Sequence, residues 1–139
     1  MEQKTWQDAE IGEDLGSVVQ VMSHEEINRY TESLDDADPW YREGSPWGGP
    51  IAPPLILVNE YIRLFKKKYH GGAWSGSLHS KMEFETIRPP LAGAVITTTG
   101  KIADKYLKRG RWSLVIETSS RDETGEEIVK SKMTLTFVR

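Results

Sequence analysis

The chain has 139 residues, a formal net charge of −3 and no cysteine. This length predicts one domain, residues 1–139, with an ordinary core. Charges of both signs are mixed along the sequence, so no basic stripe suggests nucleic-acid binding. The lack of cysteine excludes disulfides and thiolate metal sites. The N-terminus is polar and no apolar run could cross a bilayer, so we expect a cytoplasmic protein that does not engage a membrane.

The first half of the chain predicts a strand and a helix. Residues 1–14 are polar and are expected at the surface, and residues 17–22 (SVVQVM) are typical of a strand. Ser23 and Glu26 have the spacing of a capping box, which predicts a helix from there to about Leu34. Pro39 prevents its continuation.

Residues 35–53 are predicted to form a loop, with four prolines, three glycines and two tryptophans. Pro54 suits the first position of a helix, because its missing N–H costs nothing there. Residues 55–58 (LILV) are apolar on every side, so this central helix is expected to begin buried. It ends in a basic stretch, and Gly71-Gly72 is expected to terminate it.

After residue 76 the apolar residues recur with a period of two. This pattern predicts four antiparallel strands, with turns at residues 108–110 and 122–125. An antiparallel sheet with one buried helix on one face is an α+β architecture.

Four further stretches carry a family resemblance. They are Asp36-Ala37-Asp38-Pro39-Trp40-Tyr41, the run from Gly49 to Pro54 (GPIAPP), the run from Phe84 to Gly93 (FETIRPPLAG), and the run from Tyr106 to Arg111 (YLKRGR). In order and spacing the chain resembles the MaoC-like (R)-specific enoyl-CoA hydratases and 3-hydroxyacyl dehydratases, in their FAS1-like branch. The resemblance implies a single hot-dog fold, a curved antiparallel sheet wrapped around one central helix. It also implies an acyl-thioester substrate and no cofactor. The three histidines are scattered without the spacing of metal ligands, so no metal site is expected.

The resemblance places the family's catalytic aspartate on Asp36, with Tyr41 where the family has histidine. Asp36 would take a proton from water, and Tyr41 would orient that water or relay a proton. Donors for the thioester oxygen would be N–H groups at the start of the central helix, with Leu55 and Ile56 as candidates. Pro54 itself offers no N–H. Trp40 and Trp47 are candidates for lining an acyl tunnel.

Three alternatives remain open from the sequence. Asp36 can be a turn residue, one of several aspartates making Asx turns, and the two tryptophans can simply cover the helix. Glu60, on the central helix, is a candidate base or nucleophile for a hot-dog thioesterase. The chain can also be a non-catalytic subunit that supports an active partner. A dimer is expected in each case, either with its own copy or with another hot-dog chain.

Overall fold

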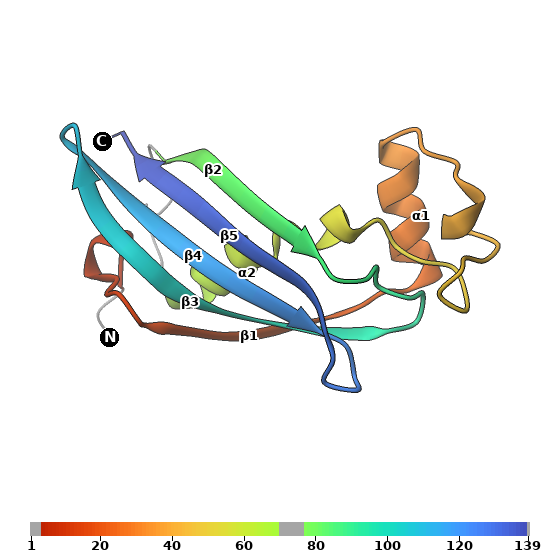
Figure 1. Cartoon of the computed structure of the whole chain (residues 1–139). Coiled ribbons are helices and arrows are strands. Elements are labelled where there is room, and N and C mark those ends of the chain that lie inside the picture. The colour runs from red at the N-terminus through yellow and green to blue at the C-terminus, as the bar shows by residue number, and fades with distance from the viewer. Residues whose placement is uncertain (1–3, 70–76, 139) are drawn as a thin grey trace.

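The computed structural model describes residues 4–69 and 77–138. Within these residues, five antiparallel strands form one sheet in the order β1-β3-β4-β5-β2 (Figure 1). The strands are β1 (Asp14–Val21), β2 (Ser77–Thr86), β3 (Val95–Lys108), β4 (Arg111–Arg121) and β5 (Glu127–Phe137). The four antiparallel strands predicted after residue 76 are therefore confirmed. β1 is the strand predicted at residues 17–22, begun three residues earlier.

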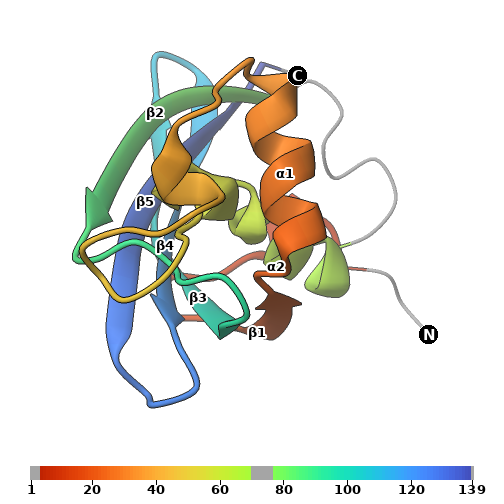
Figure 2. The same ribbon diagram turned by 90° about the vertical axis from the view of Figure 1, so that its right-hand side faces the viewer.

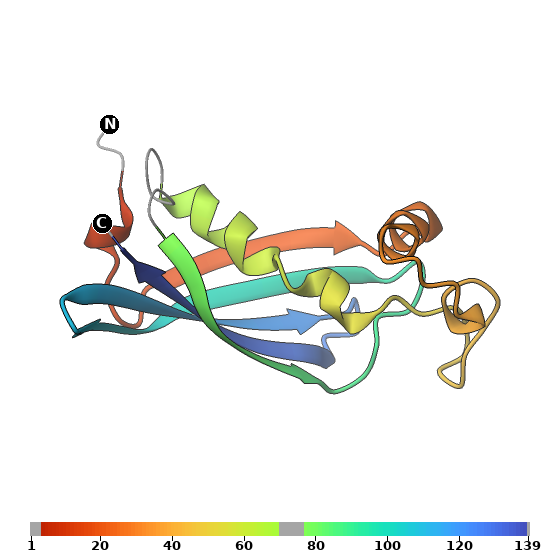
Figure 3. The ribbon, with the colours of Figure 1, turned by 90° about the horizontal axis from the view of Figure 1, so that it is seen from above.

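The central helix lies against one face of this sheet. It is α2 (Glu60–Lys68), and Figure 3 shows it running along the sheet. Leu64 and Phe65 of α2 are fully buried in a core that includes Leu114 and Ile116 of β4. Successive side chains of a strand point to opposite faces, so Ser113 and Glu117 lie on the outer face, away from α2.

The first helix and the proline-rich loop project beyond one end of the sheet (Figures 1 and 2). Helix α1 (His24–Ser33) begins as predicted, because the Ser23 hydroxyl accepts a hydrogen bond from the Glu26 N–H at 3.1 Å. Glu26 itself pairs with Arg29 rather than completing the capping box. Ile27 is buried in a second core cluster at this end of the molecule.

The predicted start of the central helix is wrong. Residues 54–58 do not begin the central α-helix: Pro54–Leu57 is a 3₁₀ turn (η3), and α2 starts only at Glu60. Leu57 of this turn is buried in the second core cluster, and such tertiary packing overrides local helix propensity. In that turn Leu57 is buried, but Leu55 is exposed. The predicted helix end at Gly71-Gly72 lies outside the described residues.

The N-terminal segment is not wholly at the surface. It contains the 3₁₀ turn η1 (Trp6–Asp8), and its Trp6 ring stacks on Phe137 of β5 with centroids 4.0 Å apart. Because Trp6 and Ala9 are buried, this segment closes one end of the main core.

The two edges of the sheet differ in how their backbone is covered. At the β1 edge, cationic side chains of α2 donate to backbone carbonyls. These bonds run from Arg63 to Val19, from Lys67 to Ser17 and from Lys68 to Asp14. β2 forms the other edge and pairs only with β5 within the described residues. Both edges expose apolar side chains, Val19 on β1 and Leu78 and Met82 on β2. Because α2 occupies carbonyls of β1, β2 is the edge better suited to adding another strand.

Candidate active site

Asp36 follows helix α1 directly, in a turn set by its neighbour. Asp35 has a left-handed backbone (φ +53°), as is common just after a helix, and the Asp36 N–H donates to the Thr31 carbonyl at 2.9 Å. The Asp36 carboxylate accepts from the Asp38 N–H at 3.2 Å. The Asx turn foreseen as an alternative for Asp36 is therefore present. It uses one carboxylate oxygen and leaves the side chain half-buried.

Tyr41 ends the 3₁₀ turn η2 (Pro39–Tyr41), which the Asp38 side chain caps by accepting from the Trp40 N–H at 3.0 Å. The Tyr41 ring packs against the second core cluster. Burial raises the pKa of the Tyr41 hydroxyl, and the charges of Asp36 and Asp38 raise it further. Tyr41 therefore stays protonated near neutral pH and can donate a hydrogen bond, but it is not a base.

The structure also brings a second tyrosine to this group. Tyr30, on the last turns of α1, lies near enough to Tyr41 to contribute to the same rise in pKa. The sequence alone did not single out Tyr30. Its position six residues before Asp36, on the helix that leads into the loop, is the signal that could have pointed to it.

The loop that carries these groups is tied back on itself. The Ile51 N–H donates to the Trp40 carbonyl at 2.9 Å, and the Trp40 and Trp47 rings meet edge to face with centroids 5.5 Å apart. Trp40 is 43% exposed and Trp47 44% exposed. The two rings thus cover one another on the surface of the loop in this single chain.

The two candidate oxyanion donors differ in availability. The Ile56 N–H donates to the Pro53 carbonyl at 3.0 Å within η3, so it is occupied. The Leu55 N–H has no acceptor among the described residues. Ile56 and Tyr41 pack against the same core cluster, which brings η3 and the Asp36 loop to one end of the molecule.

Glu60 is buried at the first turn of α2, at 6% exposure. Its carboxylate pairs with Arg63 at 2.8 Å. Burial raises the pKa of Glu60, and Arg63 only partly offsets that rise. The carboxylate is therefore engaged by its own helix rather than facing solvent.

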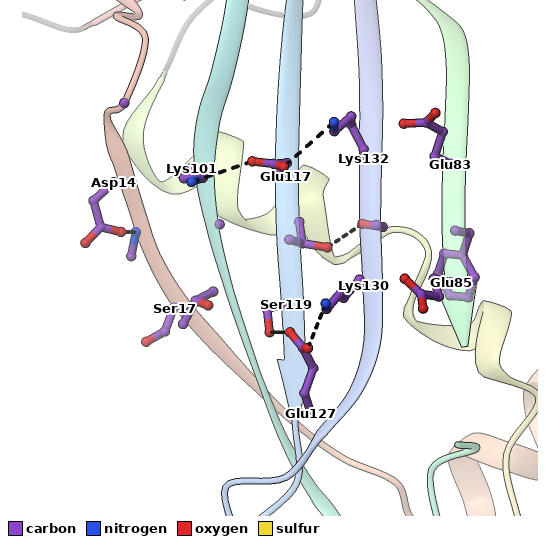
Figure 4. Close-up of a pocket in the computed structure, with 17 residues that line it drawn as sticks. Asp14, Ser17, Glu83, Glu85, Lys101, Glu117, Ser119, Glu127, Lys130 and Lys132 are labelled. Atoms are coloured by element: carbon purple, nitrogen blue, oxygen red, sulfur yellow. Dashed lines mark hydrogen bonds and ion pairs between the residues drawn. The ribbon is translucent and has the colours of Figure 1, made fainter. Parts of the chain in front are cut away.

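The outer face of the sheet carries a groove of about 1090 Å³ (Figure 4). Its three lysines are each paired with a glutamate, with Glu117 between Lys101 and Lys132, and Glu127 beside Lys130. None of the predicted site residues lines it. We therefore regard this groove as a solvated sheet face.

The described part of the chain has neither a metal-binding cluster nor a membrane-spanning helix. Residues 4–69 and 77–138 hold no group of three histidine, aspartate or glutamate side chains placed to bind a metal ion. Nor do they contain a helix long and apolar enough to span a bilayer.

Comparison with solved structures shows the fold. An R-hydratase from Pseudomonas aeruginosa aligns with a TM-score of 0.78 at 12% identity, covering 97% of this chain and 86% of that one. An (R)-hydratase from A. caviae involved in PHA biosynthesis aligns with a TM-score of 0.76 at 14% identity, covering 93% and 97%. The 3R-hydroxyacyl-ACP dehydratase complex HadBC from Mycobacterium tuberculosis gives 0.68 at 15% identity, covering 88% and 96%. The expected hot-dog fold is confirmed.

Comparison at the level of sequence shows the family. No curated protein sequence matches the chain. A family model described as "FAS1-like, dehydratase domain region" matches residues 9–131, which include the Asp36 loop, η3, α2 and nearly all of the sheet. The chain therefore belongs to the FAS1-like dehydratase family of MaoC-like hot-dog proteins.

Proposed function

We propose that this protein is a hydratase/dehydratase that acts on 2-enoyl and 3-hydroxyacyl thioesters. The observation that carries the proposal is that the Asp36 carboxylate lies near enough to the Tyr41 hydroxyl for its charge to raise the Tyr41 pKa, at the end of the molecule where η3 begins. Membership of a dehydratase family supports it. The thioester would be borne by coenzyme A or by an acyl carrier protein, in the cytoplasm.

In the proposed hydration, Asp36 accepts a proton from water as the water oxygen attacks C3 of the enoyl thioester. Tyr41 donates a hydrogen bond that orients this water. The Leu55 N–H, near the start of η3, is the donor for the enolate oxygen, and it adds no charge to the site. Asp36 then returns the proton to C2. Dehydration follows the same path in reverse.

The proposed active form is a dimer joined along β2. The β1 carbonyls are already occupied by α2, whereas β2 has an exposed edge with apolar side chains. Joining two β2 edges would extend the sheet and cover Leu78 and Met82. The partner is either a second copy or a different hot-dog chain.

A second candidate function is that of a supporting subunit. The specific observation in its favour is Tyr41 where the family has histidine, since a tyrosine with a raised pKa cannot replace a histidine base. One structural neighbour, HadBC, is a complex of dehydratase subunits. In that case an active partner would supply the aspartate and histidine.

The test is a hydration assay of the purified protein on crotonyl-CoA and longer 2-enoyl-CoAs, with Tyr41→His alongside. Activity of the unmodified chain supports the self-sufficient enzyme. If neither protein is active, that proposal fails. If activity then appears only on mixing with a hot-dog chain that bears both aspartate and histidine, the supporting role is correct.

The thioesterase alternative is tested in the same preparation by following release of free thiol. A hydrolysis that Glu60→Gln removes and Asp36→Asn leaves untouched would favour it. We expect no such hydrolysis, because the Glu60 carboxylate is held by Arg63.

A further inference from the structure

The β3–β4 hairpin forms a cationic cleft at the end of the sheet opposite α1 (Figure 1). The cleft measures about 540 Å³, within the range of small-molecule sites and larger than one anion requires. We define the hairpin cleft by its lining residues: Ser80, Tyr106, Lys108, Arg109, Arg111, Ser113 and Thr136. No predicted site residue is among them.

The charge of the cleft is not neutralised. Lys108, Arg109 and Arg111 form no ion pair within the described residues, and no carboxylate lines the cleft. On the neighbouring part of the outer face the lysines are paired, as with Lys101 and Lys132 beside Glu117. Three unpaired cations around one hollow, in a chain of net charge −3, favour an anionic ligand.

The floor of the cleft is a connected row of hydroxyl groups. The Ser80 hydroxyl lies 2.8 Å from that of Thr136, which lies 2.9 Å from that of Ser113. Ser113 is 4% exposed, Thr136 is half-buried and Ser80 is exposed, so the row runs from the sheet to the surface. Hydroxyl donors beside lysine and arginine side chains are the groups that bind phosphate oxygens.

The tip of the hairpin holds an arginine in a backbone conformation that arginine disfavours. Arg109 (φ +54°) and Gly110 (φ +76°) are both left-handed, as a two-residue type I′ turn requires. Asparagine, aspartate or glycine would occupy the Arg109 position at lower cost. Strained residues of this kind concentrate at ligand clamps, and here the strain places a guanidinium beside the cleft.

We propose that the hairpin cleft binds a nucleotide carrying at least two phosphate groups. Lys108, Arg109 and Arg111 would hold the phosphates. The Tyr106 ring, 36% exposed in the cleft, would stack on the base. Two sources share this chemistry: the nucleotide end of coenzyme A and a free nucleoside diphosphate. The proposal does not rest on the reaction proposed above.

The test is calorimetric titration of the full chain with adenosine 3′,5′-bisphosphate, ADP and pyrophosphate. We expect saturable binding of both nucleotides, more tightly than pyrophosphate, weakening as salt is added. Tighter binding of the bisphosphate assigns the source to coenzyme A, and tighter binding of ADP assigns it to a free nucleotide; each supports the site. Equal binding of pyrophosphate, or no binding of any probe at millimolar concentration, overturns the proposal.

Two variants separate the cleft from net charge and from folding. Arg109→Asn keeps a residue that tolerates the left-handed turn, so the melting temperature should hold or rise while affinity falls about tenfold. Lys66→Gln, on α2, removes the same charge from an exposed lysine without an ion pair and should leave affinity unchanged. An equal loss in both variants would mean that the cleft is not a specific site.

Discussion

Leu64 of α2 packs directly on the backbone of Gly100 in β3. A Cβ built on Gly100 would lie 2.8 Å from Leu64 Cδ1 and 3.2 Å from the Glu117 carbonyl oxygen of β4. The missing side chain thus fixes how closely the central helix approaches the sheet.

Gly100→Ala is therefore expected to destabilise the fold by about 1–3 kcal/mol, the usual cost of overpacking. Leu64 can adjust its rotamer, but the Glu117 carbonyl belongs to the sheet ladder and cannot move freely. Urea denaturation measures the change. Gly49→Ala is the control, because an added Cβ there meets nothing within 4 Å and the backbone is not left-handed. Equal stability of Gly100→Ala and the unmodified protein would contradict this packing.

Glu13 holds the end of α2 through Lys68, whose Nζ lies 2.7 Å from its carboxylate. Burial alone would raise the pKa of Glu13, but hydrogen bonding to Lys68 and other groups lowers it below the usual 4.5. An acid with a lowered pKa stabilises the fold above its unfolded pKa and loses that contribution as pH falls through the folded pKa.

Glu13→Gln should thus cost about 1–3 kcal/mol of unfolding free energy at pH 7, and this cost should shrink below about pH 4.5. Denaturation at several pH values measures it. Glu123→Gln, at an exposed turn position without an ion pair, should change little at any pH. A gap between Glu13→Gln and the unmodified protein that persists undiminished at pH 3 would be inconsistent with this linkage.

The proposed dimer predicts a difference between the two sheet edges. Met82→Glu places a charge on the exposed β2 edge and should convert a dimer to a monomer in sedimentation at micromolar concentration. Val19→Glu makes the same kind of change at β1, where α2 already covers the edge, and should remain dimeric. A monomeric unmodified protein, or dissociation by Val19→Glu alone, would argue against pairing through β2.

The strands were predictable because a half-buried strand repeats its apolar residues with a period of two, and Ser23 was predictable as a cap from its local spacing. The start of α2 was not, because Leu57 of η3 packs in a core cluster with Ile96 of β3 and Ile128 of β5, which are distant in the sequence. Trp6 was assigned to the surface because its partner, Phe137, lies at the far end of the chain. Contacts between distant segments leave no local pattern.

The candidate site was predictable only in part. Asp36 and Tyr41 were identified because residues 36–41 resemble the family's catalytic motif. The structure adds that burial and nearby carboxylates keep Tyr41 protonated. The sequence did not predict that the Ile56 N–H is occupied, because this depends on the backbone geometry of η3. It also did not predict that Glu60 pairs with Arg63, because this depends on how the two side chains are buried.

The central claim is that the Asp36 carboxylate carries the reaction. The most direct measurement is kcat/KM for hydration of crotonyl-CoA by Asp36→Asn and by Asp35→Asn, with circular dichroism to check folding. Both variants make the same chemical change one residue apart, and asparagine tolerates the left-handed backbone of Asp35. We predict a loss of about 10²–10⁴-fold for Asp36→Asn and little change for Asp35→Asn. Equal activity of the two variants would contradict the account.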